Sequence, residues 1–167
     1  VVGEHKGGYL PFTFDVTTLI LDGENDLRLT VTDPTTDGHQ ARGKQTFKRG
    51  GIWYTPQSGI WQTVWMEAVN PCGLERVQVF TDIDQNQIVV TPTFYKLSNG
   101  NRLAISVKDG GKVVAKADVV AAQGIPVVIP IKKPKLWSPE SPFLYDVVYE
   151  VKDAAGNVLD KVDAYVG

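Results

Sequence analysis

The chain has 167 residues, of which 43% are hydrophobic and 22% are charged, and its formal net charge is −2. This composition is that of one or two globular domains and excludes a disordered chain. Basic and acidic residues are interspersed, so neither nucleic acid nor membrane is an expected partner, and no apolar run is long enough to span a bilayer. The single cysteine, Cys72, cannot form an internal disulfide.

Short segments with a period of two dominate the chain. Apolar and polar side chains alternate in four of them, at 27–32, 88–95, 103–108 and 143–152. Such alternation predicts strands with one buried and one solvated face. Residues 113–122 are rich in valine and also favour a strand over a helix. Turn signals such as Asp109-Gly110-Gly111 separate these segments. The sequence therefore predicts an all-β antiparallel sandwich architecture.

A domain boundary is expected near Asn70-Pro71-Cys72-Gly73, where proline and glycine interrupt any strand. Residues 71–167 hold about seven strand-like segments, which predicts an immunoglobulin-like antiparallel β-sandwich. Residues 1–70 hold only three or four such segments, which would leave sheet edges uncovered. We therefore expect residues 1–70 to be the C-terminal part of a sandwich, completed by sequence that precedes Val1 in a longer protein.

Three of the four tryptophans lie close together between residues 51 and 67. In an extended segment, Trp61 and Trp65 share one face, and Trp53 lies in a Gly- and Pro-containing loop. Exposed aromatic rings can stack on the apolar face of a sugar. The alternative is that these tryptophans fill a sandwich core or a domain interface, and the sequence leaves both interpretations open.

A long polar loop follows the first alternating segment, at residues 33–45. Its Arg42, Lys44 and Gln45 can donate hydrogen bonds to hydroxyl or carboxylate groups. A solvated surface loop is the alternative.

No catalytic constellation is visible in the sequence. There is no nucleophile elbow and no phosphate-binding glycine loop. Asp82, Asp84 and Asn86 have the spacing that opens a calcium loop, but Gln87 stands where glycine is required. No pair of carboxylates stands out for glycoside cleavage. We expect no catalytic residue, no metal and no cofactor in this chain.

Four segments in order resemble glycoside hydrolase family two, which includes β-galactosidases, β-glucuronidases and β-mannosidases. They are Gly3 to Thr17, Gly23 to Asp33, Ser58 to Trp65, and Leu136 to Tyr145. The resemblance implies a sugar-binding jelly-roll domain over 1–70 and an immunoglobulin-like domain over 71–167. In the family, a TIM barrel follows and carries the two glutamates of a retaining hydrolysis. Trp137 offers a large apolar surface that would cap the sandwich core.

The resemblance also implies a role for two loops, 37–45 and 48–58, because first-domain loops of the family can approach the barrel mouth. The candidate substrate-binding residues are Arg42, Lys44, Gln45, Trp53 and Tyr54. Arg49-Gly50-Gly51 stands where large galactosidases have an acidic residue. The resemblance therefore does not imply galactose specificity or the cation site associated with it.

The resemblance implies an accessory region of a retaining exo-glycosidase that braces the barrel. Its expected partners are carbohydrate, through the full-length enzyme, and the TIM barrel of the same chain. Self-association is left open. The competing hypotheses are a stand-alone carbohydrate-binding module and a structural or protein-interaction β-sandwich.

Overall fold

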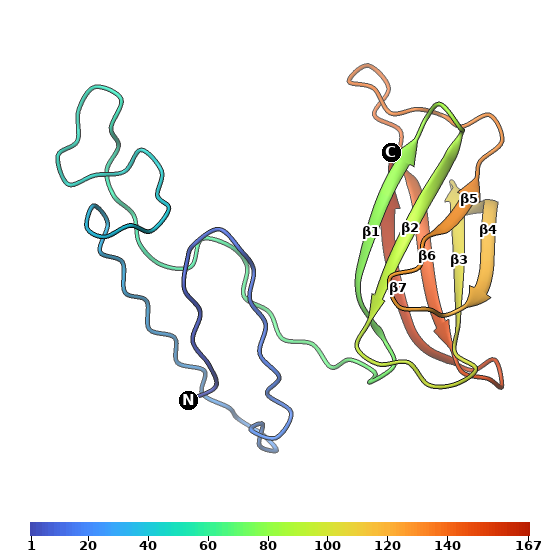
Figure 1. The fold of residues 1–167 in the computed structure, drawn as a ribbon, viewed down its shortest axis with the longest axis horizontal. Helices are drawn as coiled ribbons and strands as arrows, with labels where there is room; N and C mark the ends of the chain where they lie inside the picture. Colours follow the sequence, from blue (N-terminus) through green and yellow to red (C-terminus); the bar gives the residue numbers. More distant parts are fainter. The chain divides into compact units, whose positions relative to one another are not determined.

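A computed structural model describes all residues from Val1 to Gly167. The chain divides into two compact units, unit 1 over Val1–Met66 and unit 2 over Glu67–Gly167. The division falls four residues before the boundary predicted from the sequence (Figure 1). Strands and turns make up the regular structure, so the predicted all-β class is confirmed. No helix in the structure is long and apolar enough to cross a membrane.

Unit 2 contains the seven strands, all paired in antiparallel fashion (Figure 1). The strands are β1 (Leu74–Asp82), β2 (Gln87–Phe94), β3 (Arg102–Asp109), β4 (Lys112–Val120), β5 (Val127–Pro130), β6 (Tyr145–Lys152) and β7 (Val158–Val166). A three-stranded sheet has the order β1-β2-β5, and a four-stranded sheet has the order β4-β3-β6-β7. The two sheets face each other as a sandwich.

The core lies between the two sheets, and the alternation in the sequence decides which residues enter it. In β2 and β3 every second side chain is buried. The same holds for most of β6, where Tyr145, Val147, Tyr149 and Val151 face inward. Because a one-residue slip would turn these apolar side chains to solvent, the pattern also specifies the register of the ladders. The predicted strands over 88–95, 103–108, 113–122 and 143–152 are confirmed, with ends shifted by one to a few residues.

The connection between β3 and β4 shows how local sequence shapes the sheet. Only Gly110 and Gly111 separate the two strands, and both have positive φ angles, of 54° and 85°. A two-residue hairpin with positive φ at both positions matches the right-handed twist of its strands. Glycine reaches these angles without steric strain, so the Gly-Gly pair predicted as a turn closes a tight hairpin.

The segment between β5 and β6 is held against the sandwich by several contacts. The Lys135 amide donates a hydrogen bond to the Tyr145 hydroxyl at 2.7 Å. The Lys135 ammonium lies 2.6 Å from the Asp109 carboxylate and 4.6 Å from the centroid of the Phe143 ring. Phe143 packs edge-on against Tyr145, with ring centroids 4.8 Å apart. These contacts give a long connection a defined course over one end of the sandwich.

Unit 1 contains turns and isolated bridges, but no extended ladder. The prediction of a strand over 27–32 is therefore wrong for this structure. Leu27, Leu29 and Val31 are all exposed. An extended segment becomes a strand only when a neighbour accepts and donates its backbone hydrogen bonds, and no other segment of unit 1 pairs with this one.

Burial makes unit 2 sensitive to alkaline pH through Tyr149. This side chain is 2% exposed, and burial raises its pKa above the ordinary value of about 10. Its contribution to stability is present below about pH 10 and is lost as pH rises toward the raised folded pKa. As the pH rises above about 10, we expect the melting temperature to fall less steeply in Tyr149→Phe than in the parent chain. Equal slopes in a thermal melting series would contradict this expectation.

Candidate functional site

The five predicted site residues all lie in unit 1, and a short backbone ladder brings four of them together. The Tyr54 amide donates to the Lys44 carbonyl at 2.8 Å, and Gln45 forms a bridge with Tyr54. Trp53 is tied to Gly50 by reciprocal backbone hydrogen bonds of 3.1 and 3.2 Å. Lys44 and Gln45 are thus held beside Tyr54, which follows them by ten and nine positions.

A carboxylate that was not among the predicted site residues anchors the two loops. One oxygen of Asp33 accepts a hydrogen bond from the Thr35 amide at 2.7 Å, and the other accepts one from the Ser58 hydroxyl at 2.5 Å. These bonds, the Ser58 hydroxyl foremost, hold the pKa of Asp33 below its usual value. Thr35 has a positive φ of 54°, a conformation that the Asp33 contact helps to stabilise. The sequence contains a local signal for the bond between Asp33 and Thr35, because an aspartate side chain often accepts a hydrogen bond from the backbone amide two residues further on.

Arg42 is placed apart from the ladder. Its guanidinium donates to the Thr35 carbonyl at 3.4 Å, which is a long hydrogen bond. No hydrogen bond joins the side chains of the five candidate residues to one another. The structure therefore links Arg42 to Asp33 through Thr35, and links Lys44, Gln45 and Tyr54 through the backbone.

The site presents aromatic faces beside hydrogen-bond donors. Trp53 is 47% exposed and Tyr54 is 65% exposed. Lys44 and Arg42 are also exposed, so their cationic groups are accessible to a ligand. Such a set can stack on a sugar ring and donate to hydroxyl or carboxylate groups. It contains no nucleophile paired with a base. Across the chain, no cluster of three or more His, Cys, Asp or Glu side chains could hold a metal ion.

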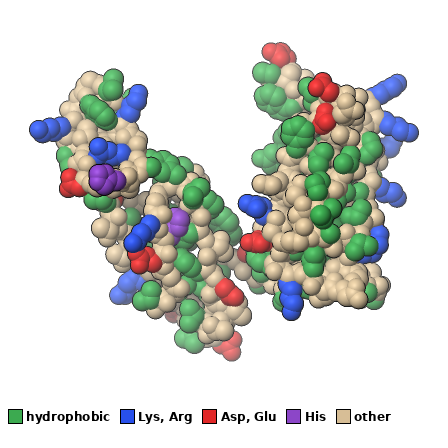
Figure 2. All heavy atoms as spheres, viewed as in Figure 1, with side chains coloured by type: hydrophobic (Ala, Val, Ile, Leu, Met, Phe, Trp, Pro, Cys, Tyr) green, Lys and Arg blue, Asp and Glu red, His purple; other side chains and the backbone are tan.

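Trp61 and Trp65 are 70% and 72% exposed, so they do not fill a core within unit 1. The indole N–H of Trp61 donates to the Gly8 carbonyl at 2.8 Å. Figure 2 shows hydrophobic side chains at the surface of unit 1. A stretch of exposed apolar side chains of this extent is typical of a binding or interdomain surface.

The fold of unit 2 defines the class of protein as an all-β module, a sandwich of two antiparallel sheets. The family model described as "Glycosyl hydrolases family 2" matches residues 73–167, which is more than half of the chain and nearly all of unit 2. The chain belongs to this family, as the resemblance in its sequence predicted.

Relatives of the chain are considerably longer than the chain itself. A β-galactosidase of Thermoanaerobacter pseudethanolicus is 32% identical over an alignment of 175 positions, which covers 95% of this chain and 22% of the relative. A β-galactosidase of Halalkalibacterium halodurans is 27% identical over an alignment of 178 positions, which covers 99% of this chain and 16% of the relative. The chain thus spans about a sixth to a fifth of the length of these curated relatives.

Solved structures agree with the fold. A glycosyl hydrolase family 2 member from Bacteroides cellulosilyticus matches with a TM-score of 0.51 and 20% identity, covering 59% of this chain and 16% of that chain. A β-glucuronidase from glycoside hydrolase family 2 matches with a TM-score of 0.50 and 21% identity, covering 59% and 13%. At this level of identity the comparison establishes the β-sandwich architecture alone.

Proposed function

We propose that the chain is a non-catalytic accessory region of a retaining exo-glycosidase that acts on O-glycosidic bonds. The observation that carries the proposal is that unit 2 matches the model of glycosyl hydrolases family 2. The relatives that the chain matches are several times longer than the chain. In this proposal unit 2 braces a catalytic TIM barrel of the same polypeptide. Residues 1–70, which include unit 1, are the C-terminal part of the sugar-binding jelly-roll domain, and residues 71–167 are the immunoglobulin-like domain.

The geometry of unit 1 supports a second part of the proposal, that its loops contribute to the substrate pocket. The Asp33 carboxylate joins the turn at Thr35 to Ser58, and the ladder at Tyr54 joins Lys44 to the same loop. Loops fixed to each other at two points can hold aromatic and cationic side chains in a constant arrangement. Such an arrangement suits a ligand with many hydroxyl groups that is bound in the substrate pocket of a neighbouring catalytic domain.

The proposal is tested by comparing the 167-residue chain with the longer protein that contains it. Both are assayed with nitrophenyl β-galactoside, β-glucuronide and β-mannoside. We expect hydrolysis by the longer protein only. Hydrolysis by the 167-residue chain would contradict the non-catalytic role, and no hydrolysis of any β-glycoside by the folded longer protein would contradict the glycosidase assignment.

Arg42→Ala in the longer enzyme tests the pocket role of the loops. Its guanidinium is exposed and makes a single long hydrogen bond, so its loss costs little stability. If the guanidinium contacts substrate, kcat/KM should fall by about tenfold or more, the loss expected when a charged hydrogen bond to substrate is removed. Arg28→Ala is the control, because Arg28 is exposed and pairs only with nearby Asp26. An unchanged kcat/KM for Arg42→Ala would contradict the pocket role.

The exposed tryptophans favour a second candidate function, that of a carbohydrate-binding module. Trp53, Trp61 and Trp65 offer ring faces that a sugar could cover. This function predicts that the 167-residue chain binds oligosaccharides by itself. Titration calorimetry with β-galactosides and β-glucuronides separates the two candidates, since the accessory role predicts no measurable binding by the chain alone.

A further inference from the structure

A cavity of about 270 Å³ lies in unit 2 between the edge strands β4 and β5, which belong to opposite sheets of the sandwich. Its lining comes from β2, β3, β4, β5 and the connection between β4 and β5, and no lining side chain carries a polar atom. A cavity of about 150 Å³ holds benzene, and pockets for drug-sized ligands begin at about 300 Å³. The volume between the two sheets therefore suits a small organic ligand.

Small side chains in β4 and the shortness of β5 leave this space unfilled. The side chains that β4 packs against the core include Ala115 and Ala117, which pair with Val107 and Ile105 of β3. β5 pairs only with residues 87–90 of β2, so the remainder of β2 has no strand on that side. The space arises where the alanines of β4 face the sheet beyond the start of β5.

The wall of the cavity is preformed, because the connection between β4 and β5 is fastened to β2. Oε1 of Gln123 accepts a hydrogen bond from the Phe94 amide at 3.1 Å, and Nε2 donates to the Phe94 carbonyl at 3.4 Å. The Gly124 amide donates to the Pro92 carbonyl at 2.9 Å. Binding to a wall that is already fixed requires little ordering of the chain.

The cavity extends from the core to the surface. Leu103 and Pro92, which both line it, are fully buried. Val120, Ile125 and Val128 also line it and are 67%, 59% and 52% exposed. A ligand can therefore enter from solvent past these three side chains and bury its apolar surface between the sheets.

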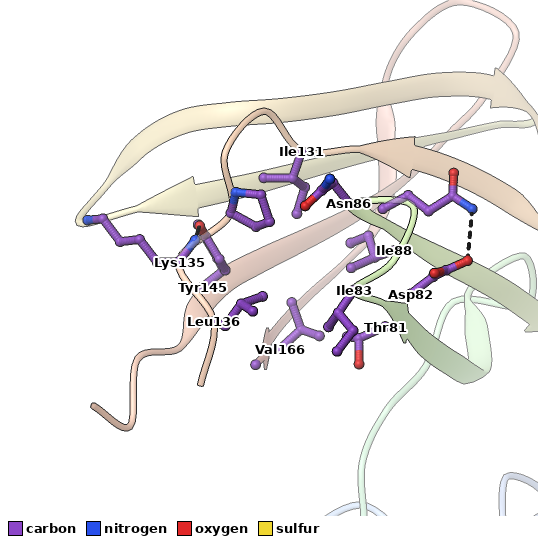
Figure 3. Close-up of a pocket in the computed structure, with 13 residues that line it drawn as sticks. Thr81, Asp82, Ile83, Asn86, Ile88, Ile131, Lys135, Leu136, Tyr145 and Val166 are labelled. Carbon is purple, nitrogen blue, oxygen red and sulfur yellow. Dashed lines mark hydrogen bonds between the residues drawn. The ribbon is translucent and has the colours of Figure 1, made fainter. Parts of the chain in front are cut away.

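The other hollow of unit 2 differs in size and chemistry. It has a volume of about 40 Å³ and lies where Val166 ends β7 (Figure 3). Asp82 and Lys135 contribute to its lining, and the Asp82 carboxylate accepts a hydrogen bond from the Gln87 side chain at 3.3 Å. This hollow has room for water but not for an organic ring.

The lining of the larger cavity also decides the chemical class of its ligand. A charged or hydroxyl-rich molecule would give up hydrogen bonds to water, and no side chain of the lining could replace them. Burial of apolar surface is the favourable contribution that this lining can make. A sugar is therefore disfavoured, and an uncharged apolar ring compound fits.

We propose that the cavity between β4 and β5 is a binding site for a small, uncharged, apolar ring compound. The site lies within unit 2, whereas the candidate sugar-binding residues belong to unit 1. It does not depend on the proposed accessory role in a glycosidase.

Titration of the 167-residue chain with toluene, followed by the methyl signals in nuclear magnetic resonance spectra, tests the site directly. Toluene should shift the methyl signals of Val119, Ile125 and Val127 with a dissociation constant of about 1 mM or below. Benzoate, which carries a carboxylate on the same ring, should bind at least about tenfold more weakly. Equal affinity for the two probes, or toluene shifts that leave these three residues unchanged, would overturn the proposal.

Ala117→Leu tests whether the ligand occupies the cavity itself. The larger side chain fills part of the space, so toluene affinity should fall at least about tenfold while the melting temperature rises by about 2–8 °C. Val113→Leu is the control, because Val113 lies on the same strand, is 47% exposed and does not line the cavity. Unchanged toluene affinity in Ala117→Leu, or equal losses in both variants, would overturn the proposal. The titration of the parent chain decides the question even if Ala117→Leu is unstable.

The same toluene titration in the longer protein distinguishes a ligand site from a space that other parts of the polypeptide fill. We expect the methyl shifts of Val119, Ile125 and Val127 to be retained there. Loss of toluene binding in the longer protein would overturn the proposal. Neither titration measures hydrolysis, so failure of the glycosidase assignment would leave this result unaffected.

Discussion

Leu103→Ala is expected to destabilise unit 2 by about 2–5 kcal/mol, the range for truncating a fully buried leucine. Leu103 has no exposed surface and lies in β3, at the centre of the four-stranded sheet. Its side chain belongs to the single core cluster that joins both sheets. Removing it loses the transfer free energy of the buried atoms and leaves a cavity that rigid ladders on both sides cannot fill.

Urea unfolding of the chain, followed by circular dichroism in the β-sheet band, measures this effect. Val120→Ala is the matched control, because Val120 is 67% exposed on the edge strand β4 and should change stability by no more than about 0.5 kcal/mol. Comparable midpoints for the two variants would show that Leu103 is not a core residue.

The second large effect concerns the unequal stability of the two units. We expect the ladder amides of unit 2 to exchange at least about a thousandfold more slowly than the amides of unit 1, given a global stability of about 5 kcal/mol or more for a folded domain. Unit 2 has seven paired strands, whereas unit 1 has isolated bridges. Unit 1 also exposes most of its large apolar side chains, so opening it costs little burial.

Hydrogen exchange with mass spectrometry of the 167-residue chain measures both units in one sample. Peptides from β3 and β6 should retain protons longest, and peptides covering 1–66 should exchange close to the rate of an unfolded chain. Equal protection in the two units would contradict this prediction. It would also indicate that unit 1 completes its own fold, against the proposal that it is part of a larger jelly-roll domain.

Much of unit 2 could be predicted from its sequence, because the alternation that specifies each strand lies within the residues of that strand. The period of two in β2, β3 and β6 follows from the pleat of a strand, which sends successive side chains to opposite faces. The Gly110-Gly111 hairpin also depends only on local backbone conformation. The same local reasoning was wrong for Leu27, Leu29 and Val31, where the alternation is present but no partner strand exists in unit 1.

Only part of the candidate site could be predicted from the sequence. Residue type and loop position indicated Arg42, Lys44, Gln45, Trp53 and Tyr54. The anchor made by Asp33 and Ser58 was missed, because these residues are 25 positions apart and their contact depends on how the intervening loop closes.

The sequence by itself determined the all-β class, the inward faces of the main strands and membership in the glycoside hydrolase family. Only the tertiary structure decided that β5 pairs with β2, that β4 joins the sheet of β3, and that Trp137, which was expected to cap the sandwich core, remains half exposed. The physical reason is the range of the interactions. Side-chain alternation and turn preference are properties of a few neighbouring residues, whereas strand order and the exposure of a large side chain depend on contacts between segments far apart in the chain.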